Sequence, residues 1–135
     1  MAESQNTRPI RIVLVNDEDH ILQMTELVLG KFLTDALVLS LRNSRTAWHV
    51  LSRMNPDLLI TDDKMPELTG EEICGRLLAK KISYPVIVNS GWPPTEQWVH
   101  ECESQGMRIR FLPGPFSMED FRKALDSSLG NRDAR

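Results

Sequence analysis

Carboxylates follow two short apolar runs of this chain, at positions where they could share one site. Residues 12–15 are apolar and are followed by Asn16 and Asp17, and residues 58–60 are apolar and lead to Asp62. An apolar run of this length predicts a buried parallel strand, and open α/β sheets place their chemistry at the carboxyl ends of such strands. Carboxylate oxygens bind hard cations and can act as nucleophiles. Two strand ends that deliver carboxylates therefore indicate a shared acidic site.

Each acid taken alone has a simpler interpretation. Asp and Asn are common after a strand, so Asp17 or Asp19 could cap the first helix, and Asp62-Asp63 could belong to a turn before Pro66. The joint pattern favours a site, because two further strand candidates end in small or polar residues at the same pole: Ser90-Gly91 and Gly114-Pro115-Phe116.

Strand and helix patterns alternate along the whole chain. The strand candidates are residues 10–15, 36–41, 58–61, 86–89 and 107–112. Apolar residues recur at helical spacing after each of them. Ser117 and Asp120 form a capping signal for the last helix, and Pro94 suits the first turn of the fourth helix. Alternating strands and helices with short connections predict a parallel sheet covered by helices on both faces.

The simplest topology places the two acidic strand ends side by side. Right-handed crossovers favour the strand order 2-1-3-4-5, which is a flavodoxin-like, doubly wound α/β fold. The first and third strands are neighbours in that order, so Asp17 and Asp62 lie on adjacent strand ends. The acidic cluster then follows from the topology of the sheet.

Length and composition indicate one cytoplasmic domain. We expect residues 8–130 to form the domain and residues 1–7 and 131–135 to be flexible tails. A net charge of -3 without a basic stripe argues against a nucleic-acid surface. The N-terminus lacks the apolar core of a signal peptide, and no run approaches the ~18 apolar residues of a membrane helix. Cys74 and Cys102 are too far apart for a metal knuckle and are predicted to be reduced and partly buried.

Residues 62–70, DDKMPELTG, resemble the phosphorylation motif of the receiver domain of two-component response regulators. The family pattern is an acidic pair after strand one, an Asp in Asp-x-x-Met-Pro-x-x-x-Gly, a Thr or Ser before a small residue, and Lys-Pro-Phe. The resemblance runs from residue 12 to about residue 129. The matching positions are, in the same order, Asn16-Asp17, Asp62 to Gly70, Ser90-Gly91 and Gly114-Pro115-Phe116.

The resemblance implies a phosphoacceptor and a metal site. Asp62 would be the nucleophile that forms an aspartyl phosphate, and the charge gathering on the phosphoryl oxygens would be offset by a metal ion and fixed donors. Mg²⁺ would bind the side chains of Asp17 and Asp62 and the backbone carbonyl of Lys64, with Asn16 holding a metal-bound water.

The resemblance also implies a switch. Ser90 would donate a hydrogen bond to a phosphoryl oxygen, and Gly91 would leave room for the phosphoryl group to enter. Phe111 would be the aromatic residue that follows Ser90 when it moves, although it could also be an ordinary apolar strand residue. The Gly114-Pro115 bond would be cis, as in the family.

Two positions depart from the family pattern. The first acid is Asn16, which brings no charge, and the near-universal Lys before Pro is Gly114. Without that ammonium, repulsion among the acids should raise carboxylate pKa values, and metal binding should stabilise the fold. Lys64 could lend its ammonium to the phosphoryl group instead. Trp92, near the rim, could shield the acyl phosphate or simply pack before the prolines.

The resemblance implies a response regulator in a two-component phosphorelay, and we expect it to stand alone because the chain ends soon after the fifth helix. It would take its phosphoryl group from a histidine kinase or phosphotransfer protein and then show a changed face built from the fourth helix, fifth strand and fifth helix, through which family members also form homodimers. Beyond self-catalysed phosphotransfer and slow autodephosphorylation it would not be an enzyme. The alternative is a pseudo-receiver that binds proteins independently of phosphorylation. A metal-dependent phosphatase would need an acid at Lys64, and a flavin domain would not carry an acidic first loop.

Overall fold

The computed structural model describes residues 8–130 and contains a five-stranded parallel sheet of order β2-β1-β3-β4-β5. The predicted fold class and strand order are therefore confirmed. The expectation of flexible tails falls on residues 1–7 and 131–135, outside the described residues. The strands are β1 (Ile10–Val15), β2 (Ala36–Leu41), β3 (Leu58–Thr61), β4 (Val86–Ser90) and β5 (Ile109–Pro113).

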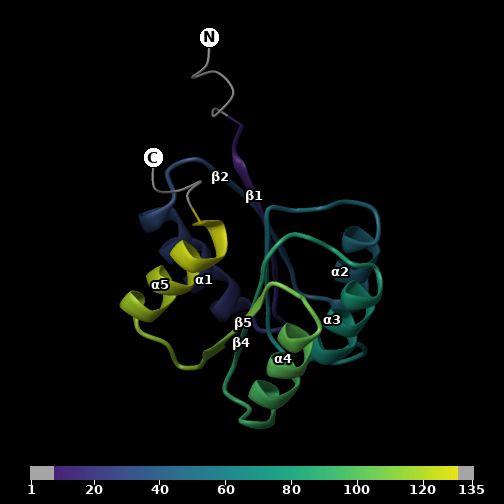
Figure 1. Cartoon of the computed structure of the whole chain (residues 1–135). Coiled ribbons are helices and arrows are strands. Elements are labelled where there is room, and N and C mark those ends of the chain that lie inside the picture. Colours follow the sequence, from purple (N-terminus) through teal and green to yellow (C-terminus); the bar gives the residue numbers. More distant parts are fainter. Residues whose placement is uncertain (1–7, 131–135) are drawn as a thin grey trace.

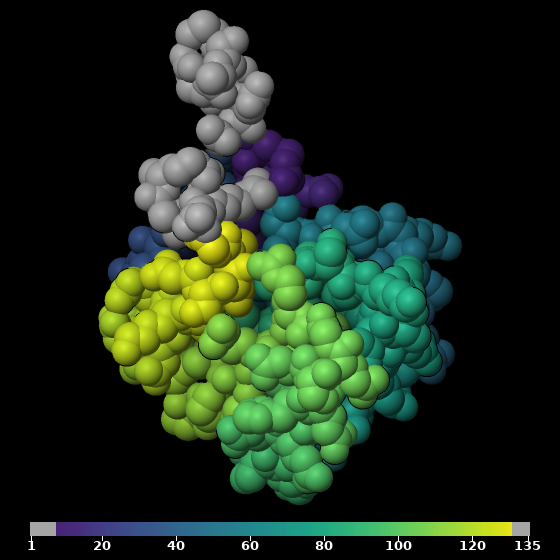
Figure 2. Space-filling view, in the orientation of Figure 1, coloured from purple at the N-terminus to yellow at the C-terminus, as the bar shows by residue number. Residues whose placement is uncertain are grey.

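Five helices cover the two faces of the sheet. In Figure 1, α1 and α5 lie on one side of the sheet, and α2, α3 and α4 lie on the other. Figure 2 shows the side of the molecule to which α4 in green and α5 in yellow contribute. No helix in residues 8–130 is long and apolar enough to cross a membrane. The helices are α1 (Asp19–Phe32), α2 (Ser44–Leu51), α3 (Gly70–Ala79), α4 (Pro94–Ser104) and α5 (Met118–Leu129).

The central strands are apolar on both faces because each face packs against helices. Along β1, Ile12 and Leu14 belong to the core under α1 and α5, whereas Val13 and Val15 belong to the core under α2, α3 and α4. This alternation is the two-residue period of a strand, and it explains why residues 12–15 form a continuous apolar run.

The predicted fifth strand is wrong at its start. It begins at Ile109, two residues later than expected, and it ends at Pro113. The amide of Met107 donates to the carbonyl of Cys102 at 3.2 Å, so this buried residue completes the end of α4 instead of pairing in the sheet. Apolar character alone does not separate a buried helix end from a strand.

The helix-start signals have mixed outcomes. The hydroxyl of Ser117 accepts a hydrogen bond from the amide of Asp120 at 3.0 Å, and Pro94 lies in the first turn of α4, as predicted. The cap of α1 is Glu18, which makes no side-chain capping bond. The alternative in which Asp17 or Asp19 caps α1 is therefore wrong.

The sheet brings four strand ends to one edge. Val15 is in register with Thr61, and the amide of Asp62 donates to the carbonyl of Val15 at 3.0 Å. At the other side of β3, Ser90 is in register with Pro113 of β5. The acidic residues after β1 and β3 and the small residues after β4 and β5 thus share the carboxyl edge of the sheet.

Candidate functional site

Asp62 is a half-buried carboxylate at the centre of this edge. Its pKa is raised from 3.8 to about 6, chiefly by burial, against the lowering effect of a hydrogen bond from the Asp63 amide at 2.7 Å. The negative charges of Asp17, Asp63 and Glu18 contribute smaller parts of the same rise. The structure thus brings Asp17 close enough to Asp62 for the two charges to interact, as the strand order predicts.

No described cation neutralises this pair. Within residues 8–130, neither Asp17 nor Asp62 forms an ion pair with Lys or Arg, whereas Asp19 pairs with Arg42 on the neighbouring loop. The ammonium of Lys64 lies 4.9 Å from the centre of the Trp92 ring. A cation held over an aromatic face gains from the negative charge of that face, so Trp92 competes with the acids for Lys64.

The donor set fits Mg²⁺. Mg²⁺ takes oxygen ligands, keeps several waters and commonly binds through one or two carboxylates. Asp17 and Asp62 supply two carboxylates without a counterion. The described residues contain no group of three His, Cys, Asp or Glu side chains arranged to hold a metal. The side-chain oxygen of Asn16 accepts from the Glu18 amide at 2.9 Å and retains one lone pair.

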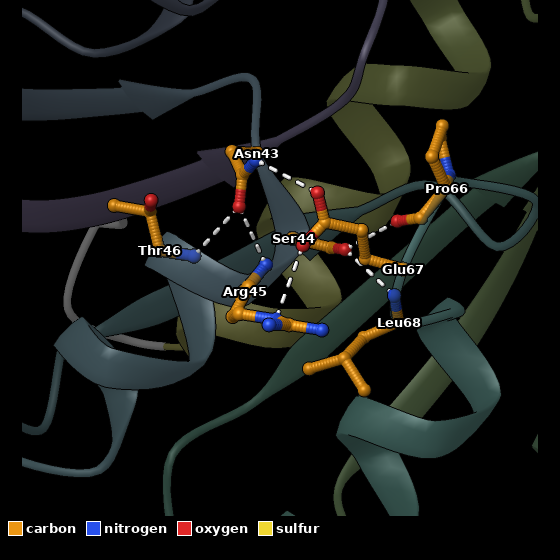
Figure 3. Close-up of polar contacts among 7 residues, drawn as sticks. All are labelled: Asn43, Ser44, Arg45, Thr46, Pro66, Glu67 and Leu68. Carbon is orange, nitrogen blue, oxygen red and sulfur yellow. Dashed lines mark hydrogen bonds and ion pairs between the residues drawn. The ribbon is translucent and has the colours of Figure 1, made fainter.

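The loop that follows Asp62 is fastened to the start of α2. The hydroxyl of Ser44 donates to the carbonyl of Pro66 at 2.7 Å and accepts from the amide of Leu68 at 2.9 Å, as Figure 3 shows. The guanidinium of Arg45 lies 3.1 Å from the carboxylate of Glu67. The backbone of Glu67 has a positive φ of 73°. These contacts fix the loop that carries the Lys64 carbonyl.

Gly70 closes the same loop against the end of β3. Its amide donates to the carbonyl of Asp63 at 2.7 Å. A Cβ at this position would lie 2.3 Å from the carbonyl oxygen of Asp62 and 2.9 Å from the Cα of Asp63. Only glycine permits this approach, which gives a packing reason for the last residue of the motif.

Asp63, next to the proposed acceptor, points into the protein. It is 4% exposed, and its Oδ2 accepts from the hydroxyl of Thr95 at 2.7 Å and from the indole N–H of Trp98 at 3.0 Å. Its Oδ1 accepts from the amide of Glu71 at 3.1 Å. From the sequence, Asp63 is interpreted only as a turn residue, and no pattern predicts this connection between β3 and α4.

The small residues after β4 and β5 adjoin one another. The amide of Gly114 donates to the carbonyl of Ser90 at 3.0 Å, and the Gly114-Pro115 bond is cis, as predicted. A Cβ on Gly91 would stand 3.6 Å from the carbonyl oxygen of Gly114, and a Cβ on Gly114 would stand 3.4 Å from the side-chain nitrogen Nδ2 of Asn89. Both are ordinary contacts, so packing within the chain does not require glycine at either position.

Phe111 lies on β5 in register with Val88 of β4. It is partly buried and packs against the core under α2, α3 and α4. Ser90 follows Val88 by two residues on the adjacent strand. The two residues of the expected switch are thus on neighbouring strands, and their coupled movement stays a prediction.

Comparison with known families gives one match across most of the chain. The family model of the response regulator receiver domain matches residues 12–126. Regulatory protein AtoC of Escherichia coli (strain K12) is 31% identical over 121 residues, which are 88% of this chain and 25% of that protein. A protein-glutamate methylesterase/protein-glutamine glutaminase of Bradyrhizobium diazoefficiens is 33% identical over 87 residues, 64% of this chain and 22% of that protein. The chain spans about a quarter of the length of these relatives.

Solved structures show the same fold. The signal receiver domain of an HD domain-containing protein from Pseudomonas fluorescens Pf-5 superimposes with a TM-score of 0.78 at 22% identity, covering 95% of this chain and all of that one. A response regulator receiver domain protein from Clostridium thermocellum gives a TM-score of 0.76 at 22% identity, covering 92% of this chain and 97% of the other.

Proposed function

Because the chain belongs to the response regulator receiver domain family, we propose that Asp62 accepts a phosphoryl group from a phosphohistidine donor in the presence of Mg²⁺. The observation that carries this proposal is the state of Asp62. It is a half-buried carboxylate beside Asp17 whose pKa is raised to about 6, and no described cation pairs with either acid. Such a pair is suited to a divalent cation and to an incoming electrophile.

The transfer is a displacement at phosphorus. An oxygen of Asp62 attacks the phosphorus atom, the bond from phosphorus to the donor's imidazole nitrogen breaks, and its electron pair stays on that nitrogen. With acetyl phosphate as donor, acetate leaves instead. Mg²⁺ held by Asp17, Asp62 and the carbonyl of Lys64, with Asn16 contacting a metal-bound water, would offset the charge on the phosphoryl oxygens.

The phosphoryl group then changes a protein-binding face. Ser90 donates to a phosphoryl oxygen, Gly91 leaves space beside it, and Phe111 moves with Ser90. The face presented to a downstream protein is formed by α4, β5 and α5, two of whose elements are prominent in Figure 2. The donor is a histidine kinase or phosphotransfer protein in the cytoplasm. The same face would support a homodimer.

Gly114 supports a second candidate function. A receiver without the Lys-derived ammonium could bind its partner in the same way whether or not Asp62 is phosphorylated, as a pseudo-receiver. Lys64 offers limited compensation, because its ammonium lies over Trp92. In this case partner affinity would be the same before and after treatment with a phosphodonor.

Intact mass spectrometry after incubation with acetyl phosphate and Mg²⁺ tests the proposal, with Asp62→Asn treated in parallel. The expected result is the gain of one phosphoryl group by the parent and none by the variant. No gain by a folded parent, or an equal gain by both proteins, would reject Asp62 as the acceptor.

A further inference from the structure

The Ser90 hydroxyl has two hydrogen-bond partners, and both belong to the segment that begins α4. The amide of Trp92 donates to the Ser90 Oγ at 3.0 Å, and the Oγ1 of Thr95 lies 3.2 Å from the same oxygen. Ser90 is 5% exposed and Thr95 is fully buried, so water does not compete for either hydroxyl. Among the described residues, Ser90 makes no hydrogen bond with Asp62.

The proton of the Thr95 hydroxyl is committed to Asp63. Their oxygens are 2.7 Å apart, and the indole N–H of Trp98 donates to the same carboxylate oxygen. The other carboxylate oxygen accepts from the Glu71 amide. Three donors converge on the two oxygens of Asp63. A carboxylate can accept all three, whereas an Asn side chain could not, because one of its two polar atoms is an NH₂ group that only donates.

This commitment decides the direction of the Ser90 bond. A threonine hydroxyl carries one proton, and Thr95 gives it to the carboxylate, the nearer and charged acceptor. The contact between the two hydroxyls is therefore satisfied by the Ser90 proton, which Ser90 donates to Thr95. The single proton of Ser90 cannot point to Thr95 and to a phosphoryl group on Asp62 at the same time.

We propose that Thr95, held in place by Asp63 and Trp98, is a positioning residue that keeps the Ser90 hydroxyl engaged with α4 and sets how readily Ser90 turns to the phosphoryl group. This inference rests on the proposed function, in which Ser90 serves the phosphoryl group on Asp62. Besides the bond from the Trp92 amide to Ser90, the site is thus connected to α4 through Asp63, the residue directly after Asp62, and Thr95.

The hydroxyl of Thr95 can be removed without leaving a buried charge unpaired. In Thr95→Val, a side chain of the same shape, Asp63 keeps its bonds from Trp98 and Glu71. Ser90 loses its acceptor in α4 and retains only the bond from the Trp92 amide. The Ser90 proton is then free for the phosphoryl oxygen.

The test measures the initial rate of phosphoryl uptake from acetyl phosphate at fixed Mg²⁺, by intact mass. We expect Thr95→Val to react about fivefold faster than the parent, the factor that corresponds to a typical net hydrogen bond. Thr95→Ser restores the hydroxyl and should react at the parent rate. Thr25→Val removes another buried hydroxyl, one that donates to the Ile21 carbonyl in α1, and should also match the parent.

A second measurement separates positioning from disruption. The indole N–H of Trp98 should give a slowly exchanging proton NMR signal in the parent and in Thr95→Val, because its bond to Asp63 remains. Loss of that signal in Thr95→Val would show that Thr95 only supports the packing around Asp63, and would overturn the inference.

The outcomes distinguish this inference from the proposed function. Uptake by the parent with an equal or lower rate in Thr95→Val overturns the inference and leaves the proposed function standing. Uptake by Thr95→Val where the parent takes up none supports the inference. Absence of uptake in every folded protein overturns both.

Discussion

The raised pKa of Asp62 predicts that its carboxylate destabilises the metal-free protein at neutral pH. The folded protein binds the Asp62 proton more tightly than the unfolded chain does, with a pKa of about 6 against 3.8. The stabilisation from protonation is therefore complete below pH ~3.8 and is lost as the pH rises through ~6. Above that range the buried charge opposes folding, and Asp62→Asn removes it while keeping an oxygen to accept from the Asp63 amide.

The size of the effect follows from the two pKa values. A difference of about two pKa units corresponds to roughly 3 kcal/mol at pH 7.5. Because the side chain is only half-buried, screening by water reduces this to about 1–2 kcal/mol. At pH 4.5 Asp62 is almost fully protonated in the folded state and mostly ionised in the unfolded chain, and linkage leaves about a third of the difference. We therefore expect Asp62→Asn to be more stable than the parent by about 1–2 kcal/mol at pH 7.5 and by much less at pH 4.5.

Urea unfolding without Mg²⁺ at both pH values measures this difference. Asp35→Asn changes an exposed Asp in the connection before β2 and should stay within about 0.5 kcal/mol of the parent. Saturating Mg²⁺ should stabilise the parent by mass action and reduce the advantage of Asp62→Asn. A variant that is less stable than the parent at pH 7.5, or an advantage that does not change with pH, would refute this reasoning.

Three further substitutions test how the site is built. Gly70→Ala should destabilise the protein by roughly 1–3 kcal/mol in urea unfolding, because its Cβ would meet backbone atoms at 2.3 and 2.9 Å. The control Gly75→Ala, in the same helix, meets nothing within 4 Å and should be neutral or stabilising. Similar losses of stability in both variants would contradict the steric argument. Ser44→Ala should lower the free energy of unfolding by roughly 1–3 kcal/mol in the same assay, because the buried Leu68 amide loses its hydrogen-bond acceptor. An unchanged urea midpoint would argue against a role for Ser44 in holding the loop after Asp62. Gly114→Lys fits beside Asn89 and should raise the stability at pH 7.5 by about 0.5–1 kcal/mol by supplying a counterion to Asp62. A smaller stabilisation by Mg²⁺ should accompany it, and an undiminished Mg²⁺ effect would count against Gly114 as the cause of the uncompensated charge.

The sheet could be predicted from sequence because each strand carries its own signal. The first three strands were predicted with the bounds that the structure has, since buried parallel strands are short apolar runs between polar turns. The strand order then placed Asp17 beside Asp62, because the topology rules leave few alternatives for five alternating units. The start of β5 is predicted too early because Met107 is apolar and buried like a strand residue. Its backbone, however, bonds to the end of α4 and does not pair in the sheet.

The polar connections behind the site could not be predicted in this way. Asp63 and Thr95 are 32 residues apart, and Ser44 and Leu68 are 24 apart, so no local periodicity joins them. Their pairing depends on which helix the sheet topology brings over each loop and on the side-chain directions there. A buried carboxylate directly after the proposed acceptor leaves no pattern in a single sequence that distinguishes it from a turn residue.

Locating the phosphoryl group by residue tests the central claim most directly. Borohydride reduces an aspartyl phosphate to homoserine, and peptide sequencing by mass spectrometry then separates position 62 from position 63. After treatment with acetyl phosphate and Mg²⁺, we expect homoserine at position 62 and unchanged Asp at position 63, whose carboxylate is buried with three donors. Homoserine at position 63, or at neither position in a folded protein, would contradict the account.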